Sequence, residues 1–343
     1  YMKNRKNKTA FFAVILAAFF FLIACSFNSV KENQNSLTFT NWNVQTFFDG
    51  ITDGIEYAEF KNKKSGWNIE QYEKRLDRLC SKIEQFDSDF FIMEELENEK
   101  IIYDISNRLS HNVWFKNKIY QYAAFQKNEK SSIGCGILSK YEITDVKVHN
   151  LDIKTEKDCM PDMRPVIEVT AKASNKKDKS DKKITIFINH WKSKSGGQNQ
   201  TEKWRLWQET VLSRLLNSRN KENDGRIIIA AGDFNKDIDD FSYDKNNSLY
   251  FSEINSSENK KIPVFSPWNQ NKETCTENDG TYYFRGKWEK IDHFFAVQNI
   301  LTDFRIEKDE ELLTDEKVPA RYEIFTGKGY SDHLPISCSI MTE

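Results

Sequence analysis

The sequence IIIAAGDFN, residues 227–235, is the most informative stretch of this chain. Its first five residues are all apolar and three are β-branched isoleucines, so they predict a buried strand. Asp233 and Asn235 follow at the end of that strand and bring one ionic and one neutral oxygen donor to the same edge of a sheet. Hard divalent cations prefer such donors. The stretch therefore predicts a buried strand that ends at a site for a metal and a phosphate.

Apolar strand patterns alternate with helical patterns on both sides of this stretch. A period near 3.6 from Ile69 to Phe86 predicts a helix with one buried face. A second helix is expected from Thr201, as its N-cap, to about Asn217. Its apolar side would carry Trp204, Trp207, Val211 and Leu215. Further strands are expected at residues 37–44, 90–93, 121–125, 134–138, 166–172, 184–189, 291–297 and 335–341. The alternation shows no compositional break and predicts one α/β domain over residues 37–343.

The composition limits the partners of this domain. The chain is 38% hydrophobic and 30% charged, but its 25 Phe, 13 Tyr and 8 Trp supply the volume for a large core. Its formal net charge is −2, so no overall basic field attracts a polyanion. A nucleic-acid site would have to be a local patch.

The N-terminal segment predicts export. A basic stretch, residues 3–8, precedes an uncharged apolar run from Ala10 to Ala24, as in a signal peptide. The run is shorter than the ~20 residues of a membrane span. Its Leu-Ile-Ala-Cys ending resembles a bacterial lipobox, with Cys25 as the lipidated residue. We expect a signal peptide over residues 1–24, a flexible tether over 25–36, and a membrane-anchored domain outside the cytoplasm. An uncleaved anchor or a buried core helix is the alternative.

The remaining cysteines do not predict a metal site. They are Cys80, Cys135, Cys159, Cys275 and Cys338, an odd number that leaves at least one thiol free unless a partner chain is bridged. Cys135 and Cys338 lie in strand patterns and are expected to pack as small buried hydrophobes. A disulfide between Cys159 and Cys275, both in loop-like segments, is left open.

Polar residues gather at the ends of the predicted strands. Those that follow a strand are Asn43, Glu95, His190, Asp233 and Asn235, and those that precede one are Asp292, Asp332 and His333. In a mixed sheet, the exits of some strands and the entrances of others share one edge, so these side chains can meet at one rim. Because buried carboxylates without partners are costly, their accumulation there indicates a functional site.

This set of residues indicates phosphate-ester hydrolysis. Several oxygen donors without thiolates suit Mg²⁺, Mn²⁺ or Ca²⁺. Two histidines can transfer protons near neutral pH. A metal that neutralises the phosphate, with a histidine that activates water, is sufficient for hydrolysis. The HExxH motif of zinc peptidases is absent, and so is a glycine-rich phosphate loop.

Six short motifs resemble, in order, those of the endonuclease/exonuclease/phosphatase (DNase I-like) superfamily. They are WNVQTFFD (42–49), MEELEN (93–98), NHWKS (189–193), GDFN (232–235), IDH (291–293) and SDHLP (331–335). The superfamily contains deoxyribonucleases, abasic-site endonucleases, inositol-polyphosphate phosphatases and neutral sphingomyelinases. The resemblance implies a four-layer α/β sandwich, in which two packed mixed, largely antiparallel sheets are flanked by helices.

The same resemblance implies a metal site. Its ligands would be Asn43, Glu95 and Asp332, with Mg²⁺ as the expected ion and Mn²⁺ or Ca²⁺ as alternatives. Asp332 could instead be a turn-forming aspartate at a strand entrance. Glu94 stands where the family usually has glutamine. It either raises the metal affinity or points to solvent.

The resemblance also implies the catalytic roles. His333 would be the general base, steered by Asp292. Asp233 and Asn235 would orient the nucleophile and contact the phosphate. His190 would bind or protonate the phosphate, although a structural hydrogen-bonding histidine is the alternative. Asp292, too, could be a turn-forming aspartate.

The segment after His190 indicates a polyanionic substrate. Lys192, Ser193 and Lys194, followed by two glycines, can track a phosphate backbone without reading its sequence. This pattern is similar to that of secreted bacterial nucleases of the superfamily. Arg164 would either contact phosphate or cap a loop. Trp268, Tyr282 and Tyr283 would either stack on bases or pack in the core.

The leading interpretation is therefore a monomeric, metal-dependent endonuclease that acts on DNA or RNA outside the cytoplasm. The second is the same chemistry on another ester, as in a sphingomyelinase-like phospholipase or an inositol phosphatase. No exposed apolar hairpin of the kind a lipid-cleaving enzyme needs is obvious in the sequence. The third is a non-catalytic surface binding module, which should have lost a core residue. None of the motif residues is lost.

Overall fold

The structure is a computed structural model that describes residues 36–110, 120–151, 163–174, 181–244, 248–254, 262–270 and 279–342. The expected signal peptide, the tether up to residue 35 and Cys25 lie outside the described residues. Cys159 and Cys275 do too, so the proposed disulfide stays a prediction. None of the helices in the described ranges is long and apolar enough to cross a bilayer.

Two mixed sheets form the framework. One has six strands in the order β15-β16-β1-β2-β4-β3, and the other has five in the order β14-β8-β7-β6-β5. The bounds in the first are β1 Ser36–Phe47, β2 Phe90–Leu96, β3 Tyr122–Gln126, β4 Gly134–Ser139, β15 Leu301–Ile306 and β16 Ile336–Met341. Those in the second are β5 Glu142–His149, β6 Val166–Ser174, β7 Asp181–His190, β8 Ile227–Asp233 and β14 Asp292–Ala296. Only β1 with β2 and β7 with β8 pair in parallel within these sheets.

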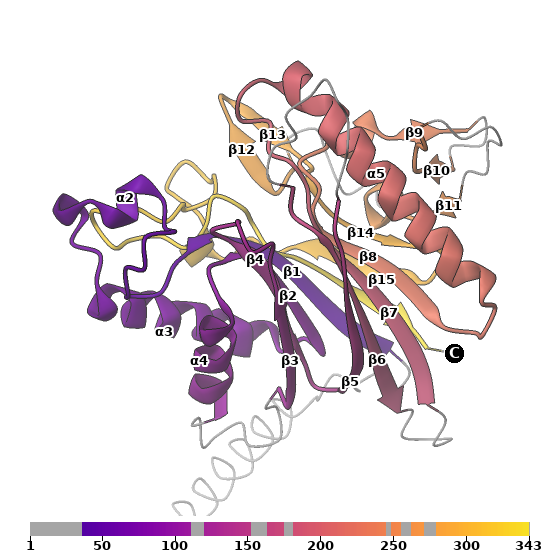
Figure 1. Cartoon of the computed structure of the whole chain (residues 1–343), viewed down its shortest axis with the longest axis horizontal. Coiled ribbons are helices and arrows are strands. Elements are labelled where there is room, and N and C mark those ends of the chain that lie inside the picture. Colours follow the sequence, from indigo (N-terminus) through magenta and orange to yellow (C-terminus); the bar gives the residue numbers. More distant parts are fainter. Residues whose placement is uncertain are drawn as a thin grey trace, which may run out of the picture. The chain divides into compact units, whose positions relative to one another are not determined.

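Helices cover the outer faces of the sheets (Figure 1). Helices α3 (Ile69–Phe86) and α4 (Glu99–Ser110) pack on the first sheet, and α5 (Gln198–Lys221) packs on the second. The shorter elements are α2 Ala58–Lys61, η1 Lys63–Ser65, η3 Ile238–Asp240, α6 Pro267–Gln270, η4 Glu310–Leu312, β9 Ser242–Tyr243, β10 Leu249–Tyr250, β11 Pro263–Val264, β12 Tyr282–Phe284 and β13 Lys287–Glu289. The expected four-layer α/β sandwich is confirmed.

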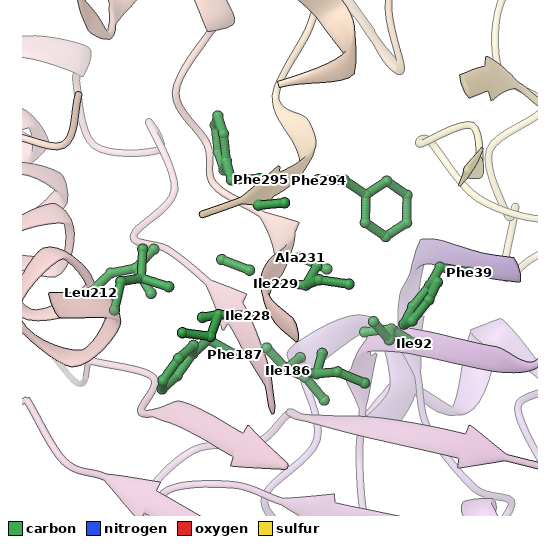
Figure 2. Close-up of a cluster of buried hydrophobic side chains, with 14 of the residues drawn as sticks. Phe39, Ile92, Ile186, Phe187, Leu212, Ile228, Ile229, Ala231, Phe294 and Phe295 are labelled. Atoms are coloured by element: carbon green, nitrogen blue, oxygen red, sulfur yellow. The ribbon is translucent and has the colours of Figure 1, made fainter. Parts of the chain in front are cut away.

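Alternation along the strands divides the core into layers (Figure 2). Phe39 and Ile92 of the first sheet and Ile186 of the second point into the space between the sheets. The next residue, Phe187, faces the other way, toward Leu212 of α5. Each of these side chains is fully buried. The second sheet is thus apolar on both faces, which explains the continuous isoleucine run.

The start of α5 differs from the expectation. Thr201 is not the N-cap, because the helix begins at Gln198 and Gly197 caps it with a φ of 111°. That backbone conformation favours glycine, and it lets the chain enter the helix earlier than a threonine cap would. The Thr201 hydroxyl instead donates to the Gly197 carbonyl at 2.9 Å.

Candidate active site

Four side chains converge on one carboxylate oxygen at the end of β8. The Oδ2 atom of Asp233 accepts hydrogen bonds from Nδ2 of Asn43 at 3.1 Å and from Nδ2 of Asn235 at 3.0 Å. It also lies 3.6 Å from Nε2 of His190 and 4.0 Å from Nε2 of His333. All five residues are at least nine-tenths buried. The sheet therefore brings together the strand-end residues as expected.

Strand register explains this convergence. Asp233 of β8 pairs with His190 of the parallel strand β7 and with Asp292 of the antiparallel strand β14. Asn43 comes from β1 of the other sheet, and His333 precedes β16. The site thus spans the two sheets at one rim, where exits of some strands meet entrances of others.

The carboxyl group of Asp233 is an unusually weak acid. Its pKa is raised to about 7, chiefly by burial, while the charge of His333 lowers it and the neighbouring Asp292 raises it. Hydrogen bonds from the Asn235 amide and from Asn43 favour the ionised form. The group can therefore exchange a proton near neutral pH.

His333 and Asp292 form a buried pair. Nδ1 of His333 lies 2.8 Å from Oδ2 of Asp292, and the other oxygen, Oδ1, has no hydrogen-bond partner among the described residues. Burial alone lowers the pKa of His333, but the charge and hydrogen bond of Asp292 outweigh it and hold the pKa well above its usual value. With Nδ1 held by Asp292, the Nε2 atom is left facing Asp233.

His190 has the opposite electrostatic environment. Burial lowers its pKa well below the usual value, and the positive charges of Arg164 and His333 lower it further. Its Nδ1 has no hydrogen-bond partner within the described part of the chain. Its Nε2 lies 3.7 Å from Oε1 of Glu95 as well as close to Asp233. His190 is therefore neutral at physiological pH.

Glu95 lies at the open side of the rim. Its Oε2 accepts a hydrogen bond from the Thr46 amide at 2.6 Å, and its Oε1 accepts one from Asn43 at 3.3 Å. Glu95 itself has a φ of 70°, which costs energy in a residue other than glycine and is common at functional sites. Asp332 is half-buried, and its negative charge raises the pKa of His333.

A buried arginine that the sequence reasoning missed holds the backbone of this site. Nη atoms of Arg75, in α3, donate to the carbonyls of Val44 at 2.9 Å, Gln45 and Thr46 at 3.0 Å. Gln45 and Thr46 have φ of 50° and 40°, and this turn directs the Thr46 amide at Glu95. Burial lowers the pKa of Arg75 to about 9. The sequence did contain a signal for this role, because Arg75 lies on the buried side of a helix with a clear apolar period.

Glu94 does not point to solvent, because adjacent residues on β2 face opposite sides. Its side chain is fully buried, with Oε2 at 3.4 Å from Nδ2 of Asn41. Its Oε1 has no partner among the described residues. Burial, and then Asp292 and Asp233, raise its pKa well above the usual value. A protonated Glu94 is neutral, like the glutamine that the resemblance leads one to expect.

We expect Glu94→Gln to raise the free energy of unfolding at pH 7 by about 1–3 kcal/mol. Since the folded-state pKa of Glu94 is raised, its contribution to stability is fully present below its unfolded pKa of ~4.3 and is lost as the pH rises. Glutamine does not titrate, so the gain should vanish near pH 4. Urea denaturation from pH 4 to 8 measures it. Glu142→Gln, on the exposed strand β5, is the control and should change little. A gain that does not depend on pH would contradict this explanation.

The segment after His190 is fixed by buried polar residues of α5. The Lys192 amide donates to Oε1 of Gln208 at 2.7 Å, and Nη1 of Arg205 donates to the Lys192 carbonyl at 3.1 Å. The buried face of α5 is accordingly partly polar, and the expected apolar side is only partly correct. Trp207, Val211 and Leu215 are half-buried rather than buried. A helix that must hold a loop at a site needs polar groups on its inner face.

The expected substrate-binding residues have different surroundings. Partial burial, then Arg164 and Arg205, lower the pKa of Lys192. Arg164 donates to the Trp191 carbonyl at 3.2 Å, so it caps this loop while its charge reaches His190. The Oγ atom of Ser193 accepts from the Ser195 amide at 3.1 Å.

Lys194 and the three aromatic candidates also differ from one another. Nζ of Lys194 is paired with Oε2 of Glu289 at 2.8 Å, so its charge is already compensated. Trp268 is buried and donates from Nε1 to the Asp292 carbonyl at 3.0 Å, so it packs in the core and the base-stacking alternative is wrong for it. Tyr282 packs against His333, whereas Tyr283 is exposed.

Two packed mixed sheets with carboxylates, amides and two histidines at one rim define a DNase I-like hydrolase fold. The profile of the Endonuclease/Exonuclease/phosphatase family matches residues 38–341. The chain therefore belongs to this family, whose enzymes are phosphoester hydrolases and typically depend on a divalent metal. The resemblance expected from the six motifs is confirmed.

Solved structures share the fold at low sequence identity. A truncated Caenorhabditis elegans TDP2 is 13% identical with a TM-score of 0.53, over 89% of this chain and 98% of that one. A Bacteroides thetaiotaomicron protein of the same family is 14% identical with a TM-score of 0.53, over 90% and 98%. A D. rerio TDP2 complexed with a single-strand DNA product is 16% identical with a TM-score of 0.52, over 89% and 98%. No curated protein sequence matches the chain.

Proposed function

We propose that this protein is a divalent-metal-dependent phosphodiesterase that cleaves nucleic acid internally, outside the cytoplasm. The observation that carries the proposal is the convergence of His190, His333, Asn43 and Asn235 on the Asp233 carboxylate. The location at a membrane and outside the cytoplasm rests on the expected export signal and on the expected lipidation of Cys25.

The oxygen donors of this rim fit a divalent cation. Within the described ranges, neither Glu95 nor Asp332 lies within ion-pair distance of a lysine or arginine, although buried Arg75 is near enough for both carboxylates to raise its pKa. Asn43, Glu95 and Asp332 would hold Mg²⁺ or Mn²⁺. A bound ion would polarise the phosphate and offset its negative charge.

His333 is the proposed general base. Asp292 fixes the ring with the proton on Nδ1 and stabilises the imidazolium that forms. Nε2 takes a proton from water, and the resulting hydroxide bonds to phosphorus. The bond from phosphorus to the leaving oxygen breaks with its electron pair on that oxygen, which takes up a proton from solvent. Asp233, held by the two asparagines, and Asn235 orient the water and the phosphate. Neutral His190 donates a hydrogen bond to a phosphate oxygen rather than a proton.

Nucleic acid is favoured as the substrate by the charge next to this site. Arg164 and Lys192 are both close enough to His190 to lower its pKa, so they form a small positive patch at the rim. With Ser193 they can contact phosphates on either side of the cleaved one. Lys194 is held by its ion pair with Glu289, so it adds to this positive patch only indirectly. The shared fold with a TDP2 complexed with a single-strand DNA product also supports this substrate.

The test is cleavage by the purified protein with Mg²⁺, with Mn²⁺ and with EDTA. Plasmid DNA, single-stranded RNA, sphingomyelin and inositol phosphates are incubated in parallel. We expect nicking of the plasmid that depends on metal and stops with EDTA, because a bound ion would polarise the phosphate. Hydrolysis of only the lipid or the inositol phosphates would assign a different substrate to the enzyme and refute the nuclease proposal. No hydrolysis of any substrate would favour the binding-module interpretation.

A further inference from the structure

A short hairpin beside the site carries exposed aromatic side chains. Strands β12 and β13 pair antiparallel and are joined by Arg285 and Gly286, with φ of 49° and 84°. A two-residue turn with both φ positive is a tight connection that matches the twist of the strands. Phe284 is 49% exposed and Tyr283 is 36% exposed. This hairpin was not singled out from the sequence, and its exposed tip is both aromatic and basic.

Flat side chains form a row from His333, the proposed general base, to the tip of this hairpin. The His333 and Tyr282 ring centroids are 4.8 Å apart, and the Tyr282 and Phe284 rings are stacked at 6.2 Å with an interplanar angle of 18°. Cζ of Arg285 then lies 5.0 Å from the Phe284 centroid. The row begins in the buried site and ends in solvent.

The base of the hairpin is fastened to the site. The Leu334 amide donates to the Thr281 carbonyl at 2.7 Å, and Tyr282 forms a β-bridge with His333. On the other side, Glu289 is paired with Lys194. Contacts on both sides hold the aromatic row at a fixed place relative to His333.

The charge at the tip is positive. Arg285 and Lys287 are exposed, while the nearby Glu289 is already neutralised by Lys194. An exposed ring flanked by exposed cations suits a ligand with a flat apolar face and negative groups on both sides. A nucleobase on a phosphate backbone has this chemistry, and base stacking on aromatic side chains tolerates any sequence.

We propose that the β12–β13 hairpin stacks an unpaired base next to the cleaved phosphate, so that the preferred substrate is single-stranded nucleic acid. Phe284 receives the base and Arg285 contacts the following phosphate. This inference rests on the proposed nuclease function. A membrane surface is the other occupant that an exposed aromatic and basic hairpin could meet, and the experiment separates the two.

The test compares Phe284→Ala with the wild-type protein on two oligonucleotides of the same length. One is ordinary single-stranded DNA. In the other, sugars that lack a base surround a single cleavable region. We expect the variant to lose about tenfold in kcat/KM on the intact strand and less than about twofold on the abasic one, because only the intact strand has a base that can stack on the Phe284 ring. Tyr103→Ala, an exposed aromatic residue on α4, is the control and should change neither.

Equal losses on both strands, or no loss on either, would overturn the stacking platform while leaving the nuclease proposal intact. Absence of cleavage by the wild-type protein would refute the nuclease proposal itself. Sedimentation with phosphatidylcholine and phosphatidylglycerol vesicles provides the membrane comparison. A loss of vesicle binding in Phe284→Ala with unchanged kcat/KM on the intact strand would assign the hairpin to a lipid surface and overturn the proposal.

Discussion

His333→Ala should lower kcat for nucleic-acid cleavage by about 10²–10⁴-fold while the protein stays folded. The imidazole provides the basic nitrogen that faces Asp233, and alanine removes it. The backbone contacts of this residue survive the change, since its amide bonds to Ser331 Oγ and its carbonyl accepts from Trp42 Nε1. Turnover at saturating substrate with Mg²⁺ measures the loss, and circular dichroism checks the fold.

His149→Ala is the matched control for this variant. His149 lies on β5 and pairs with Glu168, so it is a partnered histidine outside the site. It should retain wild-type turnover. Added imidazole should restore part of the activity of His333→Ala, because only the base is missing. Wild-type turnover in His333→Ala would show that another group accepts the proton. Asp233, with its pKa raised to about 7, would then be the residue to test.

The strands of the core could be predicted because their apolar pattern is continuous. The buried strand β8 begins at Ile227, as the pattern indicated, and continues to Asp233, two residues beyond the expected end. The edge strand β5 was missed, since all of its residues are exposed or half-buried and a register shift between Ile143 and Asp145 interrupts its alternation. Helix α4 was also missed, although its buried residues recur at helical spacing: Ile101, Ile102, Ile105 and Leu109. A pattern thus reports burial most clearly in the core, and an edge strand with little burial leaves little signal.

The positions of the site residues were predictable, but their partners were not. Strand ends bring His190, Asp233 and Asp292 to one rim whatever the details of the loops. Two features depend instead on contacts between distant parts of the chain. Arg75 acts through the turn after β1, and Lys194 is neutralised by Glu289, 95 positions later in the chain. A sequence pattern shows where a charge is, but not which charge faces it.

Asp292→Asn should lower kcat/KM on its high-pH plateau by about 10²–10⁴-fold. In the serine-protease triad, replacing the aspartate that orients a catalytic histidine costs about as much, because the ring takes the wrong tautomer. Here Asp292 is the hydrogen-bond partner of Nδ1 of His333, and both groups are buried. Asparagine keeps the size of the side chain but removes its charge. Asp145→Asn, on the exposed face of β5, is the control and should leave kcat/KM unchanged.

The pH dependence of this variant distinguishes His333 from Asp233 as the base. A general base works when it is deprotonated, so wild-type kcat/KM should rise with pH through the pKa of His333. Asp292 raises that pKa, so removing its charge should move the rising limb to lower pH. The deficit of Asp292→Asn should therefore be largest on the plateau and smallest at acid pH, where the wild-type base is protonated. Asp292 also raises the pKa of Asp233, but burial is the larger cause there. If the rising limb of kcat/KM stays near pH 7 in both the wild type and Asp292→Asn, Asp233 is the titrating group. His333 would then not be the general base.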